Sequence, residues 1–230
     1  MKLVDPYLQD VFQWDAYNWS RALSFWQANS NLDMKNSTAV ELGARNGGLS
    51  LWLAEHFKNV LCTDLTNPRA EAKILHDKYK RTGIEYAALD VTTLQAQEQY
   101  DMVVSKSLLF CFDKVQKEKA IQNIYNSLKW GGEYWFVENL RSTPMHAFLR
   151  RNFAPWGKRS NYLDINDLPA ALHNFYEVKY FTLGFVGLLG RNEMQRNLLG
   201  VIDKYFFEKI TTQEMRYVIV GVAKKNFGVD

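Results

Sequence analysis

The sequence is poor in cysteine and has no long apolar run. Cys62 and Cys111 are the only cysteines among 230 residues, too few for the disulfide framework of a small secreted protein. They also lack the spacing of metal-ligand pairs, so we predict no metal site. No stretch of about 18 uncharged apolar residues occurs, and residues 1–6 lack the apolar core of a signal peptide. These absences predict a cytoplasmic protein without a membrane span.

Linkers and strong net charge are absent as well. No segment rich in Pro, Gly or Ser divides the chain, and 47% of its residues are apolar, so one domain over residues 1–230 is expected. The net charge of +3 is too small to predict a nucleic-acid partner. Five basic residues lie close together and form either a solvated loop or a patch for an anionic acceptor: Arg141, Arg150, Arg151, Lys158 and Arg159.

Short apolar segments alternate with helical ones through the middle of the chain. Between the apolar segments, Asn67-Pro68 begins one predicted crossover helix, and Asp113 precedes another over 114–128. This alternation predicts an α/β fold with a doubly wound, Rossmann-like parallel sheet. The buried parallel strands are predicted at 38–42, 60–64, 84–89, 100–105 and 133–137.

The C-terminal part departs from this alternation. Segments 175–185 and 217–223 predict two further strands, which makes a seven-stranded sheet, and a helical stretch over 191–209 lies between them. That stretch either shapes a substrate pocket or simply packs on the core through its apolar side chains. The side chains expected to pack are Leu198, Leu199, Ile202 and Phe206.

The chain is expected to have three parts within its single domain. Residues 1–37 are rich in aromatic side chains and predict a helical cap. Residues 38–140 carry the predicted strand and helix alternation, and residues 141–230 carry the last strands and the helical insertion between them.

The most informative segment is 40–50, where an apolar strand runs into a glycine-rich turn and then into a helix. Gly43 and Gly47 allow the backbone to turn sharply and to bring its amide groups close to a ligand. Residues 49–57 have apolar side chains at helical spacing, so the positive N-terminal end of a helix would point at the bound group. The pattern predicts one wall of a pocket for a nucleotide-like cofactor.

Glu41 narrows the choice of cofactor. A dinucleotide fingerprint reads G-x-G-x-x-G, whereas here the second glycine is missing and Glu41 stands just before the first. A carboxylate would repel a pyrophosphate, which disfavours a nicotinamide oxidoreductase. The pattern of Glu41, Gly43 and Gly47 resembles the acid-x-Gly-x-x-x-Gly motif of the class I S-adenosylmethionine (AdoMet)-dependent methyltransferases.

This resemblance covers residues 38–140 motif by motif and implies a set of cofactor contacts. Asp64 ends the second strand, where an acid can accept hydrogen bonds from both ribose hydroxyls. The family also ends in an antiparallel strand pair, which fits the C-terminal segments. The other implied contacts are the turn residues Ala44, Arg45 and Asn46, Leu65 on the adenine face, Asp90 and Val91 at the adenine edge, and Ser105 and Lys106 beside the methionine end.

The resemblance also implies where the acceptor binds. In similar methyltransferases an N-terminal segment folds over the cofactor and helps select the substrate, which points to Trp14, Tyr17 and Trp19; the alternative is a helix that only covers the sheet. The Asn/Asp-Pro-Pro-aromatic motif of enzymes that methylate amino groups of nucleic acids is missing after the fourth strand. A small-molecule acceptor is therefore expected, and the basic stretch with Arg150 makes an anionic acceptor one alternative.

Catalysis needs little acid–base machinery, because the methyl group of AdoMet is already activated and the enzyme mainly holds the nucleophile in line with the carbon–sulfur bond. A hydroxyl nucleophile profits from a base, and Glu138 and His146 follow the fifth strand at the ligand-binding edge of the sheet. The alternative for His146 is a surface histidine. His56, His76 and His173 are predicted to be structural.

Together these patterns predict methyl transfer from AdoMet to a small molecule, with an oxygen of a sugar, lipid-linked or natural-product intermediate as the favoured acceptor. The alternative from another class is a non-catalytic module that binds AdoMet or its product S-adenosylhomocysteine (AdoHcy) as a sensor or partner subunit. The oligomeric state does not follow from the sequence.

Overall fold

A computed structural model of the chain describes residues 3–153 and 161–227. Its centre is one seven-stranded sheet with the strand order β3-β2-β1-β4-β5-β7-β6. Strands β1 to β5 are parallel, and β7 is antiparallel to both of its neighbours, β5 and β6. The predicted fold class is confirmed. The strands are β1 (Thr38–Leu42), β2 (Asn59–Asp64), β3 (Ile84–Ala88), β4 (Tyr100–Lys106), β5 (Leu128–Asn139), β6 (Glu177–Leu183) and β7 (Val218–Lys224).

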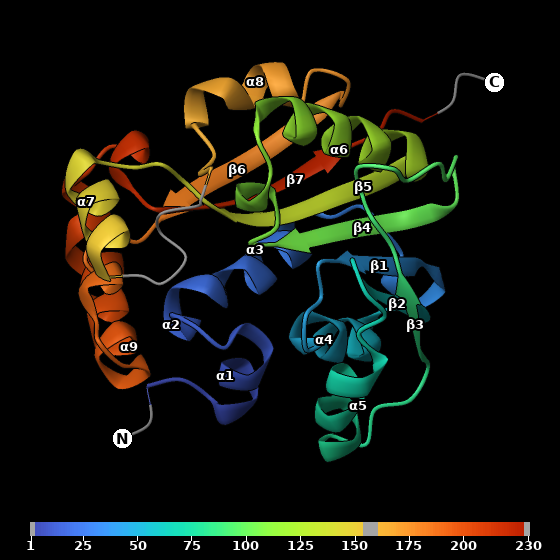
Figure 1. Cartoon of the computed structure of the whole chain (residues 1–230), viewed down its shortest axis with the longest axis horizontal. Coiled ribbons are helices and arrows are strands. Elements are labelled where there is room, and N and C mark those ends of the chain that lie inside the picture. The colour runs from blue at the N-terminus through green and yellow to red at the C-terminus, as the bar shows by residue number, and fades with distance from the viewer. Residues whose placement is uncertain (1–2, 154–160, 228–230) are drawn as a thin grey trace.

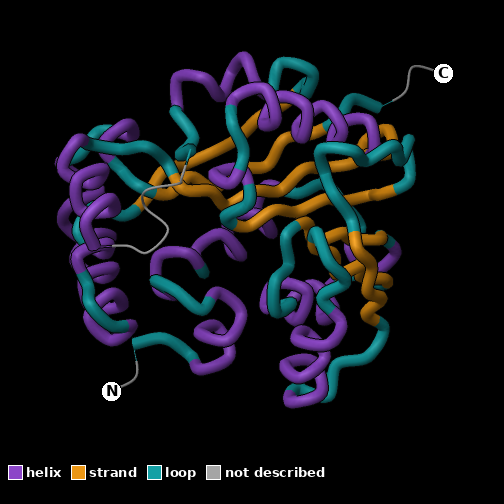
Figure 2. Tube along the Cα trace, in the orientation of Figure 1, coloured by secondary structure: helices purple, strands orange, loops and turns teal. Residues whose placement is uncertain are grey.

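Helices cover both faces of the sheet (Figure 1). On one face lie α6 (Lys114–Ser127) and the short α8 (Leu168–Ala171). On the other lie α4 (Gly48–His56), α5 (Arg69–Lys78) and the N-terminal helices. Figure 2 shows the strands running as one twisted layer between these two sets of helices. The result is the three-layered arrangement expected for a parallel sheet.

The alternation of side chains along the strands builds a separate apolar core on each face. In β1, Ala39 belongs to the core under the N-terminal helices and α4, and Val40 to the core under α6 and α8. In β4, Met102 and Val103 divide in the same way. Both faces of the central strands are therefore buried from solvent, which explains why the strands are nearly continuous apolar runs.

The predicted helix starts are close to those observed. Asp113 caps α6 in a reciprocal capping box, because its side chain accepts the Gln116 N–H at 2.9 Å while the Gln116 side chain accepts the Asp113 N–H. The start of α5 was predicted one residue early: the helix begins at Arg69, with Pro68 as the flanking residue. Asn67 still contributes, since its Oδ1 accepts the Arg69 N–H at 3.0 Å.

Residues 3–37 carry the helices of the predicted cap, α1 (Pro6–Phe12), α2 (Ala16–Trp19) and α3 (Arg21–Asn29). Helix α3 lies across the antiparallel end of the sheet, where the Trp26 indole N–H donates to the Gly221 carbonyl at 3.1 Å and its ring stacks on Trp135. Helix α1 contacts the start of α4 so closely that a Cβ on Gly48 would lie 2.4 Å from the Val11 carbonyl oxygen. The cap is thus joined to the helix that follows the glycine turn.

The helical insertion between β6 and β7 corrects one prediction. It consists of α9 (Glu193–Ile202), a π-helical turn η5 (Asp203–Phe207) and α10 (Glu208–Ile210), which follow one another without a break. Of the four side chains expected to pack, Leu198, Ile202 and Phe206 are exposed, and Leu199 alone is half-buried. The reason is that polar and small residues occupy the inner face: Asn197, Gly200 and Asp203.

Candidate cofactor and acceptor site

The predicted cofactor residues meet at the carboxyl ends of four parallel strands. The strand order reverses between β1 and β4, which are neighbours in the sheet, and open α/β sheets bind ligands at such a point. Leu42 at the end of β1 is in register with Thr63 of β2 and with Ser105 of β4. The glycine turn, Asp64 and Ser105 therefore begin at the same edge.

The turn after β1 has the backbone conformation that the glycines predict. Gly43 and Gly47 have φ angles of 70° and 73°, in the left-handed region that favours glycine. Arg45 shares this region with φ 54°, and its N–H donates to Asp64 Oδ2 at 2.7 Å. The Ala44 N–H donates to the Thr63 carbonyl at 2.8 Å. The turn and the end of β2 are thus fixed against each other.

His76 is a supporting residue that the sequence analysis described only as structural. Its Nε2 lies 2.8 Å from the Gly47 carbonyl oxygen, so this nitrogen carries the proton and donates. Its Nδ1 then accepts from the Tyr86 hydroxyl at 2.7 Å. Burial lowers the pKa of the imidazole, which keeps it neutral and suited to this donor–acceptor role. His76 holds the glycine turn from the side of α5.

Glu41 is buried beneath the turn with half of its carboxylate unsatisfied. Its Oε2 accepts from the Ser50 N–H at 2.7 Å and from the Ser50 hydroxyl at 2.5 Å. Oε1 is buried and has no hydrogen-bond partner among the described residues. Burial raises the pKa of the carboxyl to about 7, opposed by the Ser50 hydrogen bonds and by the charge of Lys106. A buried, oriented acceptor without a donor suits a ligand N–H.

The ends of β2 and β3 lie side by side and present the predicted adenosine contacts. Asp64 accepts the Arg45 N–H on Oδ2 and the Leu65 N–H on Oδ1, each at 2.7 Å, so its carboxylate is held in one orientation and remains partly exposed. The Leu89 N–H donates to the Asp64 carbonyl, which brings Asp90 close. Leu65 is 70% exposed, so its apolar surface is open to a flat ligand.

Asp90 and Val91 form a short turn at this edge. Asp90 Oδ1 accepts both the N–H and the hydroxyl of Thr92, at 2.8 and 2.7 Å. Val91 is buried, and its carbonyl accepts from the Asn123 side chain of α6 at 2.8 Å. The turn is therefore rigid, and Asp90 Oδ2 has no hydrogen bond to another described residue.

Glu138 holds the loop that follows β4. Its Oε1 accepts from the Ser105 hydroxyl at 2.8 Å and the Leu108 N–H at 3.0 Å, and its Oε2 accepts the Leu109 N–H at 3.1 Å. Burial raises the pKa of this carboxyl to about 7. The charges of Glu41 and Glu138 raise the pKa of the Lys106 amine, but burial outweighs them and lowers it. The sequence predicted Glu138 at this edge of the sheet, but not the three groups that donate hydrogen bonds to it.

His146 is not a surface histidine, which corrects that alternative. It is fully buried in α7 (Pro144–Phe153), and its Nε2 donates to the Phe185 carbonyl at 2.7 Å. Its Nδ1 lies 2.7 and 2.8 Å from the hydroxyls of Ser142 and Thr143. Both ring nitrogens are therefore used within the protein. The catalytic roles of His146 and Glu138 remain predictions.

The basic stretch does not form one patch. Arg141 is exposed and pairs with Asp164 at 3.1 Å, and Lys158 and Arg159 lie outside the described residues. Arg150, in contrast, is buried and donates to the Leu140 carbonyl at 2.6 Å, with its guanidinium 4.1 Å from the centre of the Tyr162 ring. No carboxylate pairs with Arg150 within residues 3–153 and 161–227, so its charge is not neutralised there.

Tyr162 connects this cation to the loop after β4. Its ring stacks on Phe110 with 6.3 Å between the ring centres, and its buried hydroxyl has no partner in the described part of the chain. The predicted acceptor residues of the cap have other partners: Trp14 packs edge-on against Trp19, and the Tyr17 N–H donates to Asn197 of α9. Tyr217 contacts both sets, because its ring lies 6.4 Å from that of Trp14 and its carbonyl oxygen lies 3.5 Å from Arg150 Nη2.

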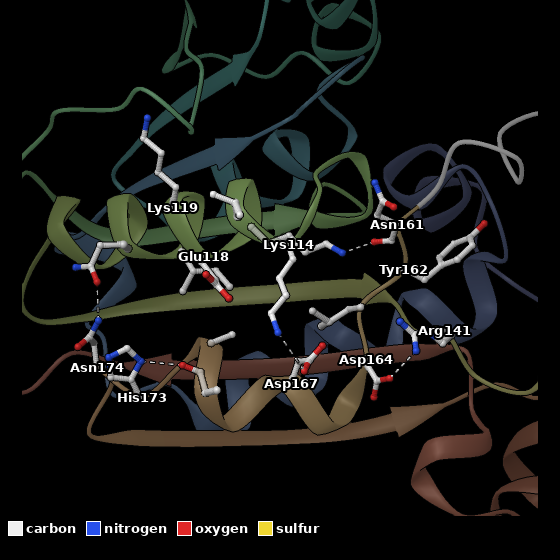
Figure 3. A pocket seen from close by; sticks show the side chains of 17 residues that line it. Lys114, Glu118, Lys119, Arg141, Asn161, Tyr162, Asp164, Asp167, His173 and Asn174 are labelled. Carbon is white, nitrogen blue, oxygen red and sulfur yellow. Dashed lines mark hydrogen bonds and ion pairs between the residues drawn. The ribbon is translucent and has the colours of Figure 1, made fainter.

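A groove of about 710 Å³ runs between α6 and residues 161–174 (Figure 3). Tyr162 lies at one end of it, and Asn174 at the other, where its side chain bonds Gln122. Lys114 and Asp167 face each other across the groove at 4.0 Å. None of the predicted cofactor residues lines it, so it is distinct from the edge that carries Glu41 and Asp64.

The buried carboxyls predict a pH-dependent stability. The pKa of Glu41 is about 7 in the folded state and 4.5 as the ordinary value, so folding favours its protonated form. Its stabilising contribution to the free energy of unfolding is complete below pH 4.5 and is lost as the pH rises through about 7. We expect Glu41→Gln to recover about 2 kcal/mol of the stability lost between pH 5 and pH 8, measured by urea unfolding. Exposed Glu71→Gln serves as the control, and equal pH dependence in wild type and Glu41→Gln would contradict the expectation.

The comparisons with known proteins agree with this geometry. A family described as a methyltransferase domain matches residues 39–132, the part from β1 into β5 that carries the predicted cofactor contacts. Residues 39–132 of the chain therefore resemble a methyltransferase domain. The match leaves the N-terminal cap and the region after Gly132 outside the methyltransferase domain, so the acceptor side has no counterpart in this comparison.

One curated relative and two solved structures show how far the similarity extends. The (S)-tetrahydroprotoberberine N-methyltransferase of Eschscholzia californica is 33% identical over 70 residues, which are 29% of this chain and only 20% of that enzyme. Phosphoethanolamine N-methyltransferase 2 of Haemonchus contortus, in complex with S-adenosyl-L-methionine, gives a TM-score of 0.66 at 16% identity, over 90% of this chain and 53% of that one. The [4+2]-cyclase SpnF gives 0.63 at 14% identity, over 98% and 93%. The fold of the methyltransferase domain therefore occurs with more than one kind of reaction.

Proposed function

We propose that this chain transfers a methyl group from AdoMet to a small-molecule acceptor. The observation that carries the proposal is the unpartnered Oε1 of Glu41, buried under a glycine turn whose other side is fixed by Asp64. This acceptor atom suits the ammonium of the AdoMet methionine group and would repel a pyrophosphate. The hydrogen-bond acceptors at this edge therefore fit AdoMet better than a dinucleotide.

Two donors of the N-terminal cap support the same fit. Gln13 Nε2 and Trp19 Nε1 are buried without an acceptor among the described residues. Gln13 follows the end of α1, whose Val11 carbonyl faces Gly48 at the start of α4. A donor near the turn suits the carboxylate of AdoMet. Asp64 would then accept from the ribose hydroxyls, Leu65 would cover the adenine, and Asp90 Oδ2 would accept from its amino group.

AdoMet would supply a methyl group on a positively charged sulfur, and the protein has to hold the acceptor atom in line with it. Glu138 contributes by positioning, because it fixes the loop that begins at Ser107 through two amide groups and the Ser105 hydroxyl. A role for Glu138 or His146 as a base would require one of their present hydrogen bonds to open. We therefore assign Glu138 as a positioning residue.

We propose that the acceptor reacts through an oxygen of a sugar, lipid-linked or natural-product intermediate, and that Arg150 and Tyr162 border its site. The uncompensated charge of Arg150 and the free hydroxyl of Tyr162 favour an acceptor with an anionic group. The groove along α6 starts at Tyr162, so a longer acceptor has room to extend along it. On the side of the N-terminal cap, the proposed acceptor contacts are Trp14, Tyr17 and Trp19.

The test is methyl transfer with isotopically labelled AdoMet against acceptor pools that contain hydroxyl and amine compounds, each with and without phosphate. Amines are included because two of the relatives are named as N-methyltransferases. We expect AdoMet binding by calorimetry and labelling of a phosphorylated hydroxyl compound. Binding without transfer to any pool would favour the sensor or partner subunit, and absence of both would refute the proposal.

A further inference from the structure

The continuous helical stretch from Glu193 to Ile210 buries its polar face and exposes its apolar face. Its inner face is polar: Asn197 accepts the Tyr17 N–H at 3.0 Å, and Asp203 accepts the N–H groups of Val186 and Gly187 at 2.7 and 2.9 Å. Gly200 lies on the same face, where a Cβ would meet the Tyr17 ring at 2.8 Å. These contacts fix the rotation of the helix about its axis.

The outer face of this helix is apolar, the reverse of a surface helix that packs on a core. Its six large apolar or aromatic side chains are between 39% and 75% exposed, and they follow the spacing of one helix face. The π-helical turn η5 adds a residue to the turn, so two neighbouring side chains face outward there. This apolar ridge consists of Met194, Leu198, Ile202, Tyr205, Phe206 and Ile210.

Cations without carboxylate partners border the apolar ridge. Arg191, Lys204 and Lys209 are exposed, and none of them forms an ion pair within the described ranges. Glu193 and Glu208 already have partners, since Glu193 pairs with Arg196 of the same helix and Glu208 pairs with Arg21, both at 2.5 Å. The ridge is therefore apolar in the middle and positively charged at its border.

We propose that this ridge docks the protein on the surface of an anionic lipid bilayer. A helix with apolar and aromatic residues on one side and Lys or Arg beside them binds at the boundary of head groups and acyl chains. The Lys204 ammonium lies 5.5 Å from the centre of the Tyr205 ring. The apolar stem of a lysine can lie along such a ring in the apolar layer of a bilayer while its charge stays at the head groups. No helix of the described residues is long and apolar enough to cross a membrane, and the proposed contact is peripheral.

A second copy of the chain fits this face less well. In a two-fold symmetric dimer the same patch would meet itself, which would bring the cations of the border toward their copies. Anionic head groups would instead neutralise Lys204 and Lys209. The proposal does not depend on methyl transfer, because it concerns a surface on the insertion after β6.

The test is flotation of the full chain with vesicles of phosphatidylcholine alone or of equal parts phosphatidylcholine and phosphatidylglycerol. We expect at least about 10-fold stronger binding to the anionic vesicles. Leu198→Glu with Phe206→Glu should abolish binding, and Lys204→Glu with Lys209→Glu should remove the preference for anionic lipid. The matched control is Ile74→Glu with Val115→Glu, which places the same change on exposed apolar residues of α5 and α6 and should bind like wild type.

Light scattering and thermal unfolding complete the design. All variants change exposed side chains, so each should keep the melting temperature of wild type within a few degrees. Failure of the wild type to bind either vesicle, or equal binding of Leu198→Glu with Phe206→Glu, would overturn the proposal. A dimer that this double substitution dissociates would also overturn it and identify a second copy as the occupant.

Discussion

Asp64→Ala is expected to weaken AdoMet and AdoHcy binding by at least about 100-fold. The proposed ribose contacts are hydrogen bonds to a charged carboxylate, each worth about 1.5–3 kcal/mol, and both are lost together. The substitution also frees the N–H groups of Arg45 and Leu65, which now share the two carboxylate oxygens. The turn after β1 would therefore lose its connection to β2.

Isothermal titration calorimetry with AdoHcy measures this effect, with circular dichroism as the check on folding. Asp64→Asn retains one acceptor oxygen and should lose less affinity than Asp64→Ala. The matched control is Asp77→Ala on α5, which removes an exposed carboxylate whose partner is Lys73. Gly43→Val should also abolish binding, because a Cβ at φ 70° is strained and would lie 2.9 Å from Leu108 Cδ1. Unchanged affinity in Asp64→Ala and Gly43→Val would remove the cofactor site from this edge.

Gly48→Val is expected to cost about 3 kcal/mol of stability and to abolish AdoMet binding. Gly48 is the first residue of α4, and a Cβ there would lie 2.4 Å from the Val11 carbonyl oxygen and 2.9 Å from that of Asp10. These are backbone atoms, so α1 has to move away as a unit. Gln13, which follows α1, would move with it.

A graded series separates this contact from helix propensity. Alanine favours a helix over glycine by about 1 kcal/mol, so Gly48→Ala would be stabilising if α1 were not in contact. We expect it instead to lose about 2 kcal/mol in urea unfolding. The control is Gly83→Ala, where φ is 76° but no atom lies within 4 Å, and where only about 1 kcal/mol of backbone strain is expected. A stabilising Gly48→Ala would show that the cap does not press on α4.

The sequence predicted the parts of the site that are encoded locally. Glu41, Gly43 and Asp64 lie at the ends of strands or directly after them, so their meeting follows from the parallel sheet alone. Contacts between distant segments could not be predicted in this way. The bond from His76 to Gly47 spans 29 positions, and the contact of α1 with Gly48 depends on how the cap folds back.

The helix after β6 shows a different limit. Its amphipathic pattern was visible, but periodicity does not say which face is buried. Packing of the apolar face on the core was one of the two alternatives, because that is the usual outcome, whereas the structure holds the polar face through Tyr17 and the Val186 and Gly187 amides. The partner Tyr17 lies 180 positions from Asn197, so no local pattern reveals it.

The antiparallel position of β7 has a consequence for the order of folding. Within the described sheet β6 pairs with β7 and with no other strand, so β7 joins it to β5. During synthesis β6 leaves the ribosome before β7, so it cannot enter the sheet until residues 218–224 have followed it. Until then the edge of β5 that β7 covers is unpaired, and an open strand edge is a site of aggregation. Insertion of β7 therefore closes two strand edges at once, that of β5 and that of β6.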